Sequence, residues 1–128
     1  MNNVRYLYLR DTSGNPHSVI AMHVDREAKA LSFQISTANK SERFDKEIGR
    51  DLAYGRLLAD SHVITIEHAN ANAHELNSYV MNCIITCSSL FAVKAVKSAV
   101  RWLEDHDARP TLKLRAYPER VAELALNS

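Results

Sequence analysis

VRYLYLR (residues 4–10), DTSGNP (11–16) and SVIAMHV (18–24) form the stretch that decides the fold. The first segment alternates and is rich in tyrosine and leucine, which is typical of a β-strand. The second is dense in residues that favour turns. The third alternates again, with Ile20, Met22 and Val24 on one face, and the segment 31–36 repeats this pattern. The sequence therefore predicts an antiparallel meander with one apolar face and one mixed face.

A change of period after this meander predicts a helix that begins at Ser41 and ends near Leu58. Ser41 is the expected N-cap residue, and Glu42 and Asp45 would lie in the first turn, where carboxylates stabilise a helix. Three apolar residues at four-residue spacing are expected to pack this helix onto the sheet: Phe44, Ile48 and Leu52.

The remaining segments alternate between short β-type runs and longer helical ones. A fourth strand is expected over 62–67, and a helix over 74–105 whose pattern allows a break near Ser88-Ser89. A last strand is expected over 111–115, and a final helical segment runs from Pro118 to Leu126. Together these elements predict one α+β domain over residues 1–128: an antiparallel three- to four-stranded meander followed by helices, with the helices packed on one face of the sheet.

The composition is that of an ordinary globular protein. Among 128 residues, 46% are hydrophobic and 24% are charged, and the formal net charge is +1, so only the distribution of charge can indicate a partner. The N-terminus lacks the regions of a signal peptide, and the longest apolar run, 80–93, is too short to span a membrane. Cys83 and Cys87 lie four residues apart on one helical face, which favours two free thiols. We expect a protein of the cytoplasm with no membrane contact.

A search for catalytic and metal-binding motifs finds none. With three glycines in the chain, at positions 14, 49 and 55, no glycine-rich loop can hold a phosphate, and nucleophile and metalloprotease motifs are missing. His106-Asp107 lies at a helix end beside Glu104 and Asp105, without the other ligands that a metal site needs. His68 and His74 could join Cys83 and Cys87 at a zinc ion, but cysteines inside a helix do not form the usual knuckle. The chain is therefore expected to bind rather than catalyse, without a metal or cofactor.

Basic residues gather on helical edges despite the near-neutral total. On the first helix a narrow sector holds Arg43, Lys46, Arg50 and Tyr54, which could follow a phosphate backbone. A second stripe, without an acid between residues 76 and 103, holds Lys94, Lys97 and Arg101, and the last expected strand adds Lys113 and Arg115. The alternative in each case is a solvated helix face, on the first helix neutralised by Glu42, Asp45, Glu47 and Asp51.

The mixed face of the sheet is the third candidate surface. If Leu7 and Leu9 face the helix, Tyr6, Tyr8 and Arg10 point to the other side and could stack unpaired bases there. The alternative is that Tyr6 and Tyr8 pack beneath the C-terminal helices or at a subunit interface.

RFDKEIGRDLAYGRL (43–57) resembles a pattern in small early proteins of tailed bacteriophages, in which a three-stranded meander leads into such a helix. The matching positions are Phe44, Lys46, Gly49, Arg50, Ala53, Gly55, Arg56 and Leu57. In size and order of elements the whole chain is similar to the Drc family of phage cofactors. The resemblance implies single-stranded DNA binding without strong sequence preference, support of an RNA polymerase in early or middle transcription, and a place in the cytoplasm of the infected host.

A rival hypothesis starts from the uncharged run 76–93, which holds Tyr79, Met81 and Phe91. Exposed on the surface, this run could grip a bacterial enzyme and so modulate the host. The same run makes a homo-oligomer an expectation under every hypothesis.

Overall fold

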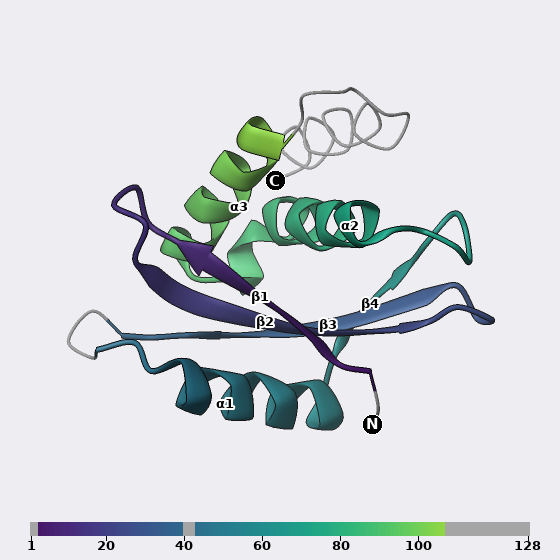
Figure 1. The fold of residues 1–128 in the computed structure, drawn as a ribbon, viewed down its shortest axis with the longest axis horizontal. Helices are drawn as coiled ribbons and strands as arrows, with labels where there is room; N and C mark the ends of the chain where they lie inside the picture. Colours follow the sequence, from purple (N-terminus) through teal and green to yellow (C-terminus); the bar gives the residue numbers. More distant parts are fainter. Residues whose placement is uncertain (1–2, 40–42, 107–128) are drawn as a thin grey trace.

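The computed structural model describes residues 3–39 and 43–106. The strand expected over 111–115, with Lys113 and Arg115, and the helix expected from Pro118 lie outside the described residues. Four strands form one antiparallel sheet in the order β1-β2-β3-β4 (Figure 1), so the predicted meander is confirmed. They are β1 (Arg5–Arg10), β2 (Pro16–Asp25), β3 (Ala30–Thr37) and β4 (His62–Thr65).

The turns of the meander follow from local chemistry. The Asp11 carboxylate accepts the backbone N–H groups of Ser13 and Asn15, and Gly14 takes a φ of 87°, which suits a residue without a side chain. Between β1 and β2 the register shifts after the pair Leu9–Ser18, and Arg10 pairs with Pro16. His17 is thereby left without a partner on β1, and such a bulge can re-aim a side chain.

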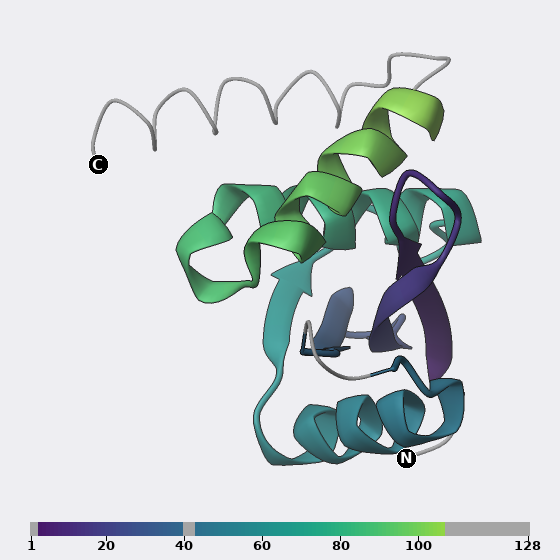
Figure 2. The same ribbon diagram turned by 90° about the vertical axis from the view of Figure 1, so that its left-hand side faces the viewer.

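The helices cover both faces of the sheet. Helix α1 (Lys46–Ala59) lies on one face, and α2 (Ala73–Thr86) and α3 (Val93–His106) lie on the other (Figures 1 and 2). The expectation that all helices share one face was therefore wrong. Its physical reason is that β2 carries apolar residues in both directions: Ile20 and Met22 face α2, whereas Val19 and Ala21 face α1.

Helix α1 also begins later, and buries a different row, than the sequence suggested. Asp45, not Ser41, is the N-cap, and its carboxylate accepts the N–H groups of Glu47 and Ile48 at 2.9 and 3.1 Å. The residues buried against the sheet are Gly49, Ala53 and Leu57, while Ile48 and Leu52 are exposed. Of the predicted row, Phe44 is half-buried and packs against the same cluster. The row that begins with Gly49 and Ala53 is buried because these small residues let the helix lie close to Val19.

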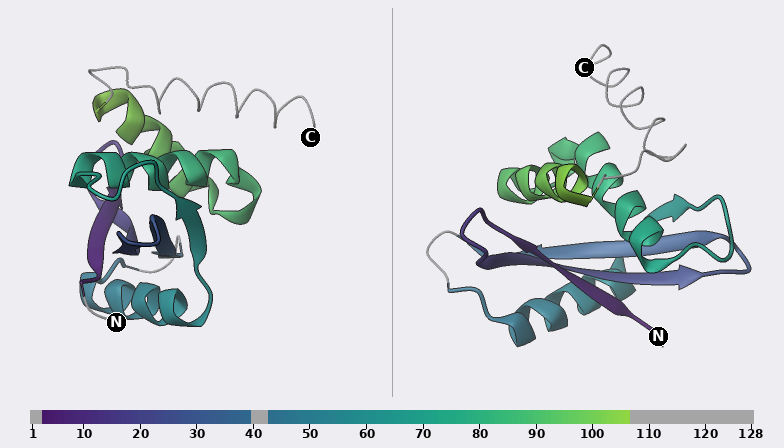
Figure 3. Two further views of the ribbon diagram at one scale, coloured as in Figure 1. Left: turned by 90° about the vertical axis from the view of Figure 1, so that its right-hand side faces the viewer. Right: turned by 45° about the horizontal axis from the view of Figure 1, so that its top comes forward.

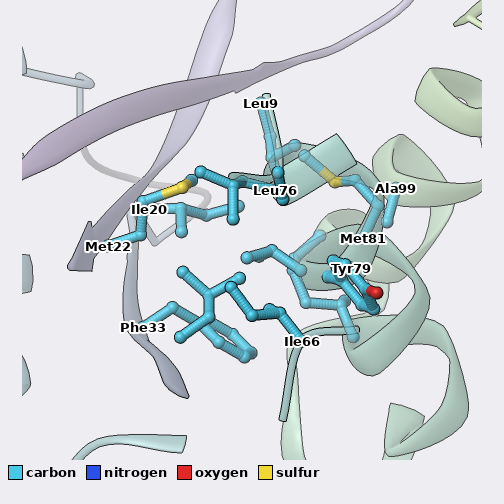
Figure 4. Packing of buried hydrophobic residues seen from close by; sticks show 14 residues of the cluster. Leu9, Ile20, Met22, Phe33, Ile66, Leu76, Tyr79, Met81 and Ala99 are labelled. Carbon is cyan, nitrogen blue, oxygen red and sulfur yellow. The ribbon is translucent and has the colours of Figure 1, made fainter. Parts of the chain in front are cut away.

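The larger core lies between the sheet and the other two helices. Leu9, Ile20, Met22 and Phe33 from the strands meet Leu76, Met81 and Ala99 from the helices, all almost fully buried (Figure 4). A short helix, η1 (Ser88–Leu90), separates α2 from α3, which confirms the break expected near Ser88-Ser89. Cys83 and Cys87 form no disulfide bond with each other, as predicted, and both are half-buried. Figure 3 shows α3 crossing over α2.

The apolar run behind the rival hypothesis lies in this core. Tyr79 is 6% exposed and Met81 is fully buried, and both belong to the packed face of α2. These two side chains support the sheet and are not exposed to a partner, whereas Phe91 of the same run is half-buried. Only its end is exposed, at Leu90 and Val93.

Candidate nucleic-acid interface

A groove of about 420 Å³ runs between strand β1 and helix α3. It lies beside the edge strand of the sheet, at the end that carries the turn from Asp11 to Asn15. Its lining residues include three with aromatic or imidazole rings (Tyr8, Trp102 and His106), two cations (Arg10 and Arg101) and two acids (Asp11 and Asp105). Its volume lies within the range of about 300–1,000 Å³ typical of small-molecule sites.

The arginines of this groove are held by backbone carbonyl groups. Arg101 donates from Nη2 to the carbonyl of Arg10 at 2.9 Å and to Ser98 Oγ at 2.9 Å. Arg10 donates from Nη1 to the carbonyl of Gly14 at 3.0 Å. These bonds fix the orientation of both guanidinium groups, and each keeps further N–H donors for a phosphate because the group carries five.

Aromatic rings line the wall that α3 provides. The rings of Trp102 and His106 are stacked, with centroids 4.3 Å apart, and His74 of α2 stacks on Trp102 from 5.5 Å. Trp102 is half-buried, packs against the larger core and lines the groove. A base that enters the groove could stack on this platform.

Lys46 extends the site toward α1. Its ammonium group lies 5.1 Å from the ring centroid of Tyr8, a distance typical of a cation–π contact. Tyr8 also meets Phe44 edge-on, with ring centroids 6.3 Å apart. Tyr8, Arg10, Lys46 and Arg101 therefore gather along β1, although they come from three different elements. We call this set, together with Trp102, the β1 site.

A hydrogen-bonded network between β2, β3 and α3 lies next to the β1 site. His17 Nε2 lies 2.7 Å from Ser98 Oγ, and His17 Nδ1 lies 2.7 Å from Ser18 Oγ, which donates to Thr37 Oγ1. Burial lowers the pKa of His17 below 6.5; Lys94 and Arg101 lower it further, while Asp11 acts in the opposite direction. Ser98 Oγ also donates to the carbonyl of Arg10 and accepts from Arg101 Nη2. The network positions β1 against α3.

The other predicted residues are divided between different places. Arg50 is exposed and Tyr54 half-buried on α1, four and eight residues beyond Lys46 and so on the same side of the helix. Lys94 donates to the carbonyl of Ala38 and, with Lys97, lines a second groove at the end of β3. Arg43 precedes α1 and lines a third groove. The structure thus joins four of the predicted residues and separates Lys94, Lys97 and Arg43 from them.

The expected tyrosine platform on the open face of the sheet was wrong. Helix α1 covers that face, where Tyr8 packs against Val19, Ala21 and Phe44. Tyr6 remains 37% exposed. Stacked rings are found instead at Trp102 and His106, a pair that the sequence pattern had not singled out. Their spacing of four residues on a basic helix was the available signal.

Comparison with known proteins finds no matching family model, no matching curated protein and no matching solved structure. The resemblance of 43–57 to phage early proteins therefore stays a prediction. None of the helices in the described part of the chain is long and apolar enough to cross a membrane. Within residues 3–39 and 43–106, no three histidine, cysteine or acidic side chains come together as metal ligands.

Proposed function

We propose that this protein binds single-stranded DNA at the β1 site, with little dependence on base sequence. The observation that carries the proposal is the groove lined by Tyr8, Arg10, Arg101 and Trp102, with Lys46 close to the Tyr8 ring on the α1 side of the same edge strand. Cations with free N–H donors suit phosphates, and a half-buried indole suits an unpaired base, which together are the two parts of a non-specific single-strand site. A duplex does not expose its base faces, so a stacking groove favours the single strand.

The further role proposed for the chain, as a cofactor of RNA polymerase in phage transcription, rests on the resemblance of residues 43–57. Its place in the cytoplasm of an infected bacterium has the same basis. The rival role of gripping a host enzyme was motivated by Tyr79 and Met81, which are buried, and by Phe91, which is half-buried.

Titration of a labelled oligothymidylate of about 15 nucleotides, followed by fluorescence anisotropy at several salt concentrations, tests the proposal. Each phosphate contact contributes about −0.7 to the slope of log K against log salt, so three cations should give a slope of about −2. Lys46→Gln should reduce this slope by about one contact. The matched control is Lys29→Gln, which removes the same charge from the turn between β2 and β3 at the far end of the sheet.

The indole gives a second, independent signal because Trp102 is the single tryptophan of the chain. Stacking of a base on it should quench the intrinsic fluorescence in proportion to binding. A binding constant that does not change with salt would overturn the proposal, and so would binding that leaves the tryptophan signal unchanged. Competition with duplex DNA and with RNA of the same length then ranks the three nucleic acids.

A further inference from the structure

Strand β3 is paired on its outer side over only half of its length. Strand β4 pairs with Ala30–Phe33, and in the described part of the chain no strand follows it along the second half of β3. The N–H of Ala38 donates to the carbonyl of His17 in β2, so by alternation the main-chain groups of Ile35 and Thr37 face outward. An outward-facing stretch of this kind is a site where an additional strand can pair.

At Ile35 two side chains occupy the position that a neighbouring strand would take. The Ile35 N–H donates to Gln34 Oε1 at 3.1 Å, and the Ile35 carbonyl accepts from Arg56 Nη1 at 2.9 Å. Gln34 in turn donates to the carbonyl of Asp60 at 2.7 Å. Because these partners are exposed or half-buried side chains, an incoming backbone can replace them at little cost.

Two grooves of similar size lie on opposite faces of the sheet at this strand end. One, of about 460 Å³, lies between β3 and α1 and is lined by the exposed Ile48 and Leu52. The other, of about 450 Å³, lies between β3 and the start of α3 and is lined by Val93, which is 70% exposed. Thr37 and Ala38 belong to both linings. The side chains of a strand point alternately to the two faces, so an added strand would place successive residues in one groove and then in the other.

The charges around this strand end are mostly positive. Arg43 lines the first groove, Lys94 and Lys97 line the second, and Arg56 reaches the edge itself. The single acid in either lining is Asp45, whose carboxylate accepts two N–H groups of α1. A second copy of this edge would bring like charges together, which disfavours self-pairing and favours an acidic occupant.

We propose that the open end of β3 binds an extended peptide segment of another protein by β-strand addition. The segment is apolar at successive central positions, so that its side chains fill the two grooves, and it carries Asp or Glu at both ends. Its backbone pairs with Ile35 and Thr37, and Arg56 is released to meet one of its carboxylates. This peptide site lies on the edge opposite the β1 site, so it goes beyond the proposed binding of DNA.

The probe is a fluorescein-labelled peptide of eight residues, with an Asp-Glu pair at each end and valine and leucine alternating between them. Anisotropy should show saturable binding to the protein. The same peptide with N-methyl groups on alternate central residues loses its hydrogen-bond donors on one side and should bind at least tenfold more weakly. A peptide with Lys-Lys pairs at its ends should also bind at least tenfold more weakly.

Matched pairs of exposed apolar residues locate the site. Leu52→Gln should weaken binding of the acidic peptide about tenfold, whereas Leu58→Gln, on the same helix and similarly exposed (54% against 49%), should leave it unchanged. Val93→Gln should weaken binding similarly, whereas Val63→Gln, with 65% exposure on β4, should not.

Failure of the acidic peptide to bind at millimolar concentration would refute the proposal. Equal binding of the N-methylated peptide, or equal effects of the two members of each pair, would also refute it. A dimer in sedimentation equilibrium that Leu52→Gln and Val93→Gln both dissociate would assign the edge to a second copy and overturn it as well. Titration of oligothymidylate with the same variants separates the two proposals, since neither Leu52 nor Val93 belongs to the β1 site.

Discussion

The two glycines of α1 should respond in opposite ways to the same substitution. A Cβ on Gly49 would lie 3.0 Å from Val19 Cγ1 and 3.3 Å from the ring of Phe44, whereas a Cβ on Gly55 would have no neighbour within 4 Å. Both positions are inside the helix, where alanine is favoured over glycine by about 1 kcal/mol. Gly55→Ala should therefore raise the free energy of unfolding by about 0.5–1 kcal/mol.

Gly49→Ala receives the same gain in helix propensity but must move a neighbour. Val19 is fully buried in the sheet, so its methyl group has little room to retreat, and overpacking of this kind typically costs about 1–3 kcal/mol. The net change should be a loss of roughly 0–2 kcal/mol. Urea denaturation of both variants measures the difference directly. Equal stabilisation by the two substitutions would contradict the close approach of α1 to the sheet at Gly49.

Two further predictions concern the network and the rim of the β1 site. The lowered pKa of His17 means that the unfolded chain binds its proton more tightly than the folded one, so the free energy of unfolding should be fully retained above about pH 6.5 and fall as the pH decreases below it. Urea titrations of the wild type and of His17→Asn across this range should differ in slope, and parallel curves would show that His17 does not contribute. Asp105→Asn removes an acid from the groove and should tighten binding of oligothymidylate about two- to threefold at low salt, while Asp25→Asn at the far end of the sheet should not. An unchanged affinity for the Asp105 variant would place the DNA away from this groove.

The strands, and the break between the two helices that follow β4, could be predicted because local sequence patterns determine them. The alternation around Ile20 and Phe33 is a period-two signal that the turn at Gly14 confirms, and four strands follow in that order. The side of the sheet that a helix covers is a tertiary property. In α1, the rows beginning at Ile48 and at Gly49 have the same spacing, and hydrophobicity alone selects the larger residues. The row that begins at Gly49 is buried because its first residues are small enough for the helix to approach the sheet, which the hydrophobicity of the sequence does not show.

The candidate site was predictable in its residue types and less so in its geometry. Arg101 and Lys94 share one stripe on α3, yet the helix crosses the sheet, so Arg101 reaches Arg10 while Lys94 reaches Ala38. From the sequence, a stripe of cations on one helix looks like a single surface. Because α3 crosses the sheet at an angle, the two ends of this stripe lie at different sites. Trp102 packs against the core, as a single aromatic residue in an amphipathic helix usually does, and the sequence pattern does not show that it also lines a groove.

The main-chain groups at β1 and at the open end of β3 have different hydrogen-bond partners. This difference explains why we propose a different ligand for each edge. At β1, Arg101 and Ser98 both donate to the carbonyl of Arg10, so the edge is tied to α3 and the cations beside it are fixed in place. Fixed cations beside an indole suit a ligand recognised by its charge and its rings. At β3, the flexible side chain of Arg56 satisfies Ile35, and the grooves beside it hold exposed aliphatic residues. A replaceable hydrogen bond flanked by aliphatic pockets suits a ligand recognised by its backbone.

A protein with both edges in use could hold a single strand of DNA and a segment of another protein at the same time, because neither ligand needs a residue that the other occupies.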